Sequence, residues 1–156
     1  MNESSPLFFE KQSYSNWVIL LLTILWLLMI LAPLYQLEES RVLIIVSAIY
    51  LPIVFFLWMH QLTTYVYSDH IQVKIWPVNK TILFHEISEW HIREYSPIKE
   101  YGGWGIRTTS GRKRIAYNMR GNIGLQIILK NDKRILIGTQ RPEELEKTLK
   151  DNIKLH

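Results

Sequence analysis

Two long uncharged apolar segments constrain this chain more than any other feature of its sequence. They run from Trp17 to Leu34 and from Val42 to Met59, and each holds 18 residues without a charged side chain. As helices, both would be about 27 Å long, close to the thickness of the hydrocarbon layer of a bilayer. Only Tyr35 to Arg41 separate the two segments, which requires the helices to lie antiparallel. The sequence therefore predicts a two-helix transmembrane hairpin over residues 17–60.

Two other interpretations of these segments are weaker. A cleaved signal peptide would have a basic amino-terminal region, whereas residues 1–16 carry two acids and one lysine, and Ala32-Pro33-Leu34 does not make a small-residue cleavage site. A buried helical pair in a globular core rarely contains two adjacent segments of this length without charge. Residues 1–16 are accordingly expected to form an N-terminal tail ahead of the hairpin.

Charge is distributed unevenly along the chain. Residues 1–61 hold two Lys/Arg and four Asp/Glu, while residues 62–156 hold 16 Lys/Arg and 10 Asp/Glu, a net charge of +6. Basic residues favour the cytoplasmic side of a membrane, and a hairpin places both termini on one side. We therefore expect a multi-pass protein of the plasma membrane with both termini in the cytoplasm.

The carried domain, residues 61–156, shows the alternation that is typical of β-strands. Apolar and polar residues alternate through several short segments, and a tight turn at Ser68–His70 and a break at Pro77 separate the first of them. Asn131-Asp132 tolerate positive φ and are expected to join the clearest hairpin. The strands are expected over residues 62–67, 71–76, 81–84, 87–95, 104–107, 113–117, 123–130 and 133–138.

One amphipathic helix is expected to close the chain. Pro142 suits the first turn of a helix, and Leu145, Leu149 and Ile153 recur every four residues along one face. About seven strands followed by one helix predict a small α+β or barrel-like domain.

The titratable residues form no pattern that is typical of catalysis or metal binding. His85 and His91 lack the spacing of a metal site, the cluster Gly102-Gly103-x-Gly105 lacks the helix and lysine of a phosphate-binding loop, and the chain has no cysteine. We expect no enzyme activity, no metal and no cofactor.

One segment is strongly basic. From Tyr101 to Asn131 there is no acidic residue, and the net charge is +6. A basic protein surface without a partner explains this as well as binding does; the binding alternatives are anionic lipid headgroups and an acidic protein partner. No nucleic-acid ligand is expected, because no known nucleic-acid-binding pattern accompanies the charge. The candidate contacts for an anionic surface are Arg107, Arg112, Lys113, Arg114 and Arg120.

Two stretches of the second half are similar to a known group. YGGWGIR and AYNMRGNIGLQIILKNDKRILIGTQRPEEL resemble the C-terminal half of small prokaryotic membrane proteins that carry a bacterial pleckstrin-homology-like (PH-like) domain. The resemblance implies a two-helix anchor and a seven-stranded, partly open barrel plugged by the C-terminal helix. It implies no phosphoinositide site, because the first loop is only Ser68–His70 where lipid-binding members have a long basic loop.

These observations together predict a membrane-anchored, non-enzymatic interaction module, with a PH-like domain held at the cytoplasmic membrane surface. The alternative function is that of an accessory subunit of a membrane enzyme or transporter complex, with the hairpin as its docking surface.

Overall fold

The computed structural model describes residues 5–31, 40–109, 111 and 113–153. The chain divides into two compact units. One unit comprises Met1–Gln12 and Gln61–His156, and the other comprises Ser13–His60. The N-terminal segment thus belongs to the same unit as the β-rich part of the chain. In the sequence, the helical pair is inserted between these two parts of that unit.

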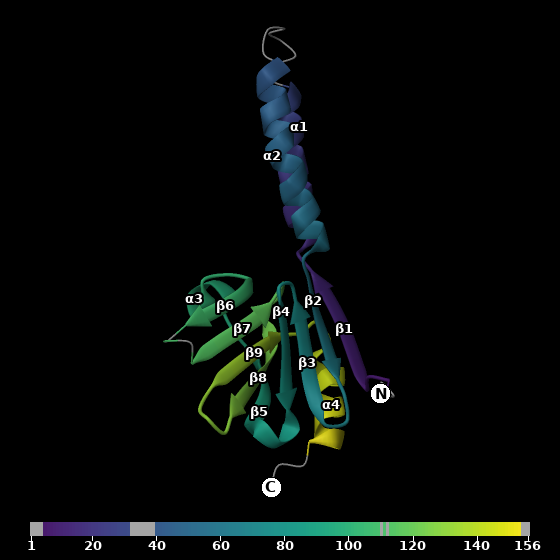
Figure 1. The fold of residues 1–156 in the computed structure, drawn as a ribbon, viewed down its shortest axis with the longest axis vertical. Helices are drawn as coiled ribbons and strands as arrows, with labels where there is room; N and C mark the ends of the chain where they lie inside the picture. The colour runs from purple at the N-terminus through teal and green to yellow at the C-terminus, as the bar shows by residue number, and fades with distance from the viewer. Residues whose placement is uncertain (1–4, 32–39, 110, 112, 154–156) are drawn as a thin grey trace. The chain divides into compact units, whose positions relative to one another are not determined.

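The inserted unit is a pair of helices, α1 (Asn16–Leu31) and α2 (Ser40–Met59), which lie side by side (Figure 1). Polar and aromatic contacts join them. The hydroxyl oxygens of Thr23 and Tyr50 are 2.8 Å apart, Trp26 Nε1 donates to Ser47 Oγ at 3.3 Å, and the rings of Trp26 and Tyr50 stack with centroids 4.9 Å apart. These contacts satisfy the polar groups between the helices and leave apolar side chains on the outside.

The structure contradicts the predicted membrane hairpin. In the described ranges, no helix has the combination of length and apolarity that crossing a bilayer requires. Helix α1 has 16 residues, fewer than the roughly 20 that a span needs, and Ala32 to Leu34 of the first predicted span lie outside the described residues. This finding contradicts the prediction that residues 17–34 and 42–59 span a membrane. It also contradicts the prediction of a multi-pass plasma-membrane protein with cytoplasmic termini.

The first sheet has the strand order β1-β2-β3-β4. Its strands are β1 (Phe8–Ser13), β2 (Gln61–Val66), β3 (His70–Ile75) and β4 (Val78–Leu83). The predicted strands at 62–67 and 71–76 and the tight turn between them are confirmed, since β2 and β3 pair antiparallel with Leu62 opposite Ile75. The sequence pattern does not predict β1, which adds to the edge of this sheet from before the helical pair.

The second sheet has the order β5-β8-β9-β7-β6 (Figure 1). Its predicted hairpin is confirmed, because β8 and β9 pair antiparallel through Gly124 opposite Gly138. By contrast, β7 and β9 pair parallel, with Ala116 opposite Leu136. The elements are η2 (Phe84–Glu86), β5 (Ile87–Glu94), α3 (Pro97–Tyr101), β6 (Gly105–Thr109), β7 (Arg114–Asn118), β8 (Ile123–Leu129) and β9 (Arg134–Gly138).

The predicted C-terminal helix is confirmed as α4 (Pro142–Asn152). Its apolar stripe is buried as expected: Leu145 and Leu149 are fully buried, and Ile153 directly after the helix is buried too. Each such leucine contributes about 1.5–3 kcal/mol through its removal from water. The helix contacts β5 and β8, so its buried leucines pack near these two strands of the second sheet.

The predicted PH-like barrel is wrong. The structure has two separate open sheets of four and five strands, not one partly open barrel of about seven. A barrel requires its first and last strands to pair with each other. Here β9 lies between β8 and β7, which leaves β5 and β6 as edges, and β1 and β4 form the edges of the other sheet. The fold is therefore an open α+β fold.

Candidate functional site

Parallel pairing of β7 with β9 brings four basic residues together. Arg114 and Arg134 are the first residues of these strands and lie opposite each other in the register. A lysine precedes each arginine, and the Arg134 backbone N–H donates to the carbonyl of Lys113 at 2.8 Å. All four side chains are exposed. We call Lys113, Arg114, Lys133 and Arg134 the cationic corner.

Local structure fixes the position of both lysine–arginine pairs. The turn between β8 and β9 contains Asp132 at φ 62°, and the Lys133 backbone N–H donates to Asn131 Oδ1 at 3.2 Å. An aspartate tolerates this left-handed conformation because its short side chain can bond locally. Downstream of the arginines, the buried residues Ala116 and Leu136 hold the two strands in register. The corner is thus set by a rigid turn on one side and by the core on the other.

The arginines of the corner belong to a row across one face of the second sheet. Register partners on neighbouring strands share a face, so Thr109, Arg114, Arg134, Ile128 and Glu89 follow one another from β6 to β5. Within the described ranges, none of the ion pairs includes a residue of the corner. Among the described residues, the positive charge of the corner is therefore not neutralised by an ion pair.

One carboxylate close enough to be influenced by Arg114, that of Glu100, is already paired. Arg93 Nη2 contacts Glu100 Oε2 at 2.8 Å, and Arg93 Nε donates to Gln126 Oε1 at 3.2 Å. The hydrogen bond from Arg93 lowers the pKa of the Glu100 carboxyl, and the charge of Arg114 adds to this effect. The same hydrogen bond raises the pKa of Arg93. Glu100 is therefore held by Arg93 and only influences the corner at longer range.

A small apolar cluster supports the same face. Tyr95, Tyr101, Ala116 and Leu136 are buried together, with the rings of Tyr95 and Tyr101 in an edge-to-face arrangement 6.1 Å apart. Burial raises the pKa of both tyrosine hydroxyls. Because Ala116 and Leu136 lie two residues after Arg114 and Arg134, this cluster anchors the strands that carry the corner.

The structure brings together only part of the predicted basic surface. Lys113 and Arg114 lie in the corner, and Arg107, opposite Ala116, is on the same face but donates through Nε to the Trp104 carbonyl at 2.9 Å. Arg120 follows the far end of β7, away from the corner. Arg112 lies outside the described residues. The predicted contacts therefore do not form one continuous surface.

Lys133 and Arg134 are missing from the sequence-based candidates. A signal for them exists, since Lys-Arg-Ile occurs at 113–115 and again at 133–135. The repeat has structural meaning only once the two strands are known to be parallel neighbours, because an antiparallel pairing would place the two motifs at opposite ends.

Two other features, a pocket and the possibility of a metal site, give weaker evidence for a functional site than the cationic corner does. An open pocket of about 340 Å³ is lined by His85, Glu86, Leu129, Lys130 and Asn131. Among the residues described, no group of three His, Asp or Glu side chains gathers as a metal site would require.

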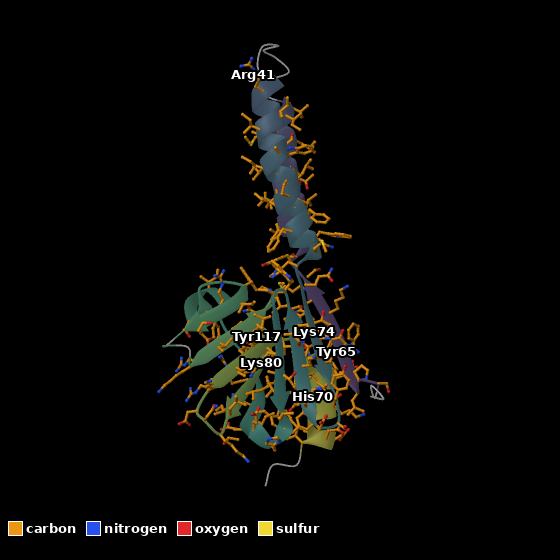
Figure 2. All side chains as sticks on the ribbon, in the orientation of Figure 1. Arg41, Tyr65, His70, Lys74, Lys80 and Tyr117 are labelled. Carbon is orange, nitrogen blue, oxygen red and sulfur yellow. The ribbon has the colours of Figure 1, made fainter. Side chains whose placement is uncertain are left out.

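The outer face of the first sheet carries an aromatic row. Phe9 contacts Tyr65 with ring centroids 5.2 Å apart, Tyr67 stacks on His70 at 4.6 Å, and Lys74 Nζ lies 5.1 Å from the centre of the Tyr65 ring. Tyr65, His70 and Lys74 are labelled on this sheet in Figure 2. Because these rings already contact one another, a histidine or a lysine, we interpret the row as side-chain packing that stabilises the sheet.

The comparisons with known proteins add no assignment. No family model, no curated protein and no solved structure matches the chain. The fold contradicts the resemblance to PH-like membrane proteins. The comparisons found no match that would support it.

Proposed function

We propose that this protein is a non-enzymatic interaction module and that its cationic corner binds an acidic partner protein. The observation that carries the proposal is the register of β7 and β9, which sets Arg114 directly opposite Arg134. Like charges opposite each other on neighbouring strands destabilise a sheet. An acidic partner would offset the repulsion between the two arginines. Binding of such a partner would therefore explain why the two like charges lie opposite each other.

The chemistry of the corner suits binding. Its row neighbours on either side are Thr109 and Ile128, and neither is a general base or an activated nucleophile. Arginine presents several N–H donors in a planar fork and pairs with carboxylates in two-point geometry. Two arginines flanked by two lysines therefore provide both specific donors and long-range attraction.

The test uses the full chain and a fluorescein-labelled peptide of alternating glutamate and serine. Replacing all four corner residues by Gln should weaken binding about tenfold or more, since each exposed pair contributes about 0.2–1 kcal/mol. Binding of the unmodified chain should weaken as salt rises, because screening acts over about 8 Å at physiological ionic strength. Fluorescence anisotropy measures both effects.

A matched control carries the same loss of charge elsewhere. Lys11, Lys80, Lys99 and Lys147 are exposed lysines outside the corner, and their replacement by Gln should leave peptide binding nearly unchanged. Equal weakening in the two variants would show that net charge alone attracts the peptide and would refute the proposal. Preferential binding of the chain to vesicles with anionic lipid, at equal charge, would refute the protein partner as well.

The helical pair supports a second candidate function, that of a subunit docked on apolar helices of a larger protein complex. Ile44, Leu51 and Phe55 of α2 are 58–68% exposed, an unusual amount for large apolar side chains so close together. Replacing these three by Gln should shift the chain from a large to a small species in size-exclusion chromatography of a cell extract. The corner variant serves as the control, and its large species should persist. If both variants keep the large species, docking through α2 is excluded.

A further inference from the structure

We infer that the Arg114–Arg134 pair is the site for a phosphorylated side chain of the partner. This inference rests on the proposed function and narrows it from acidic proteins in general to a phosphorylated segment. It concerns the charge and geometry of the ligand that two opposed guanidinium groups fit best.

The first argument is spacing. Neighbouring strands in a sheet lie about 4.8 Å apart, and Arg114 and Arg134 leave that sheet on the same face at the same register. Two long side chains with such close origins converge on one small group more readily than on two separate ones. A single carboxylate has two oxygens, which one arginine fork already satisfies. A phosphoryl group has three terminal oxygens and can occupy both forks at once.

The second argument is charge balance. A phosphorylated serine carries a charge of about −1.5 to −2 at neutral pH, which compensates both guanidinium groups together. The nearby Glu100 does not supply this charge, because it is bound to Arg93 at 2.8 Å. Lys113 and Lys133 extend the positive field at the strand starts without competing for the same two-point geometry.

The third argument is the floor of the site. Ile128 lies opposite Arg134 and Thr109 lies opposite Arg114, and both side chains are half-buried. Ile128 offers an apolar contact to the carbon atoms of the bound residue, and the Thr109 hydroxyl offers one more donor. The turn at Asp132 and the buried Leu136 fix the position of the arginine backbones before any ligand arrives. Such preorganisation lowers the ordering cost of binding.

The experiment compares three labelled peptides of one sequence that carry serine, phosphoserine or glutamate at the central position, with acidic residues on both sides. The full chain should bind the phosphoserine peptide about tenfold more tightly than the glutamate peptide, because charge-assisted two-point bonds to a dianion are stronger. Replacing both Arg114 and Arg134 by Lys should remove this preference while keeping most of the affinity for the glutamate peptide. The matched control, Arg41→Lys with Arg120→Lys, should retain the preference.

The pH dependence gives a separate readout. The second ionisation of phosphoserine has a pKa of about 6, so affinity for this peptide should fall between pH 7.5 and pH 5. Affinity for the glutamate peptide should stay nearly constant over that range, because a glutamate side chain titrates near pH 4.3. Circular dichroism verifies that each variant is folded.

The outcomes separate the two proposals. Equal affinity for the phosphoserine and glutamate peptides, with weak binding of both by the four-residue Gln variant, would overturn the phosphoryl site and leave the acidic partner in place. Failure of the chain to bind any of the three peptides at low salt would overturn both. A preference for phosphoserine that survives the double Lys substitution would also overturn the assignment to these arginines.

Discussion

At the scale of single residues, the second sheet depends on a close approach at Gly124. A Cβ atom added there would lie 2.9 Å from the Ile137 carbonyl oxygen and 3.3 Å from both Tyr95 Cε1 and Leu136 Cδ1. The first of these atoms belongs to the backbone of β9 and cannot move without disturbing the pairing of β8 with β9. The glycine is therefore required by packing of the strand pair that also carries Arg134.

Substitution of Gly124 by Ala should destabilise the protein. Overpacking of a core typically costs about 1–3 kcal/mol. We expect a melting temperature lower by about 5 °C or more, measured by circular dichroism. Thr108→Ala on the exposed edge strand β6 is the control and should change the melting temperature little. A Gly124→Ala protein as stable as the original would show that β9 can shift to accept the methyl group.

The ion pair between Arg93 and Glu100 predicts a dependence of stability on pH. The pKa of Glu100 is lowered in the folded protein, so its contribution is present above the unfolded pKa, near 4.3, and is lost as pH falls through the folded value. Glu100→Gln should therefore reduce the free energy of unfolding at pH 7 by about 0.5 kcal/mol, a small effect because the pair is partly exposed.

The same substitution should have almost no effect at an acidic pH below the folded pKa, where the carboxyl is protonated in both states. Urea denaturation at the two pH values measures the difference. Glu94→Gln, at an exposed position at the end of β5, is a suitable reference. A constant difference between Glu100→Gln and the original at both pH values would mean that the carboxylate charge does not matter.

At the scale of secondary-structure elements, β1 is attached by buried polar side chains as well as by its pairing with β2. Glu10 is only 5% exposed; it accepts a hydrogen bond of 2.6 Å from Thr139 Oγ1 and one of 2.7 Å from the Gln140 backbone N–H. Gln12 Nε2 donates to the Gly138 carbonyl at 2.7 Å. These contacts fix the segment between β9 and α4 to a strand from the other end of the chain.

Replacing Glu10 by Ala should therefore loosen both β1 and the start of α4. Removing a buried acceptor leaves its donors unsatisfied, at a cost of about 1–3 kcal/mol. Glu10→Gln keeps one carbonyl oxygen as an acceptor and should reduce the free energy of unfolding by less than Glu10→Ala does. Chemical denaturation gives the free energies, and Lys11→Ala on the exposed side of β1 provides the comparison. If Glu10→Ala and Lys11→Ala are equally stable, β1 is held by its strand pairing alone.

The elements also show how far sequence reasoning reaches. Alternation in Ile123–Lys130 and the four-residue spacing of Leu145, Leu149 and Ile153 specify local structure and a buried face, and both predictions are confirmed. Periodicity does not specify which strand lies beside which. The parallel pairing of β7 with β9 therefore could not be predicted, and half of the cationic corner depends on it. Strand β1 could not be predicted from the sequence pattern either, because its inward-facing residues include Glu10 and Gln12, whereas the pattern of a half-buried strand has apolar residues there.

At the scale of the whole molecule, the chain consists of two units that differ in chemistry. The inserted helical unit carries many exposed apolar side chains, whereas the β-rich unit carries most of the charge. Each unit holds one of the two candidate interaction surfaces. Substitutions in one should therefore leave the function of the other intact, which is why the corner variant serves as the control for the α2 variant.

The strand order predicts how protection from hydrogen exchange varies over the β-rich unit. Strands β8 and β9 lie inside the five-stranded sheet and pair on both sides, while β4 and β6 are edges. Amide protons of β8 and β9 should exchange most slowly, because only larger opening events expose them. Exchange followed by mass spectrometry measures this directly. Faster exchange in β9 than in β6 would contradict the observed strand order.

The contact of Glu10 with Thr139 has a consequence for how the protein is made. Its two ends are 129 positions apart in the sequence, and the whole helical unit is translated between β1 and β2. At about 5–20 residues per second, a ribosome needs on the order of ten seconds to advance from one partner to the other. During that interval β1 has been synthesised, while the segment that receives Glu10 does not yet exist. Strand β1 can therefore form this contact only after about 129 further residues have been synthesised.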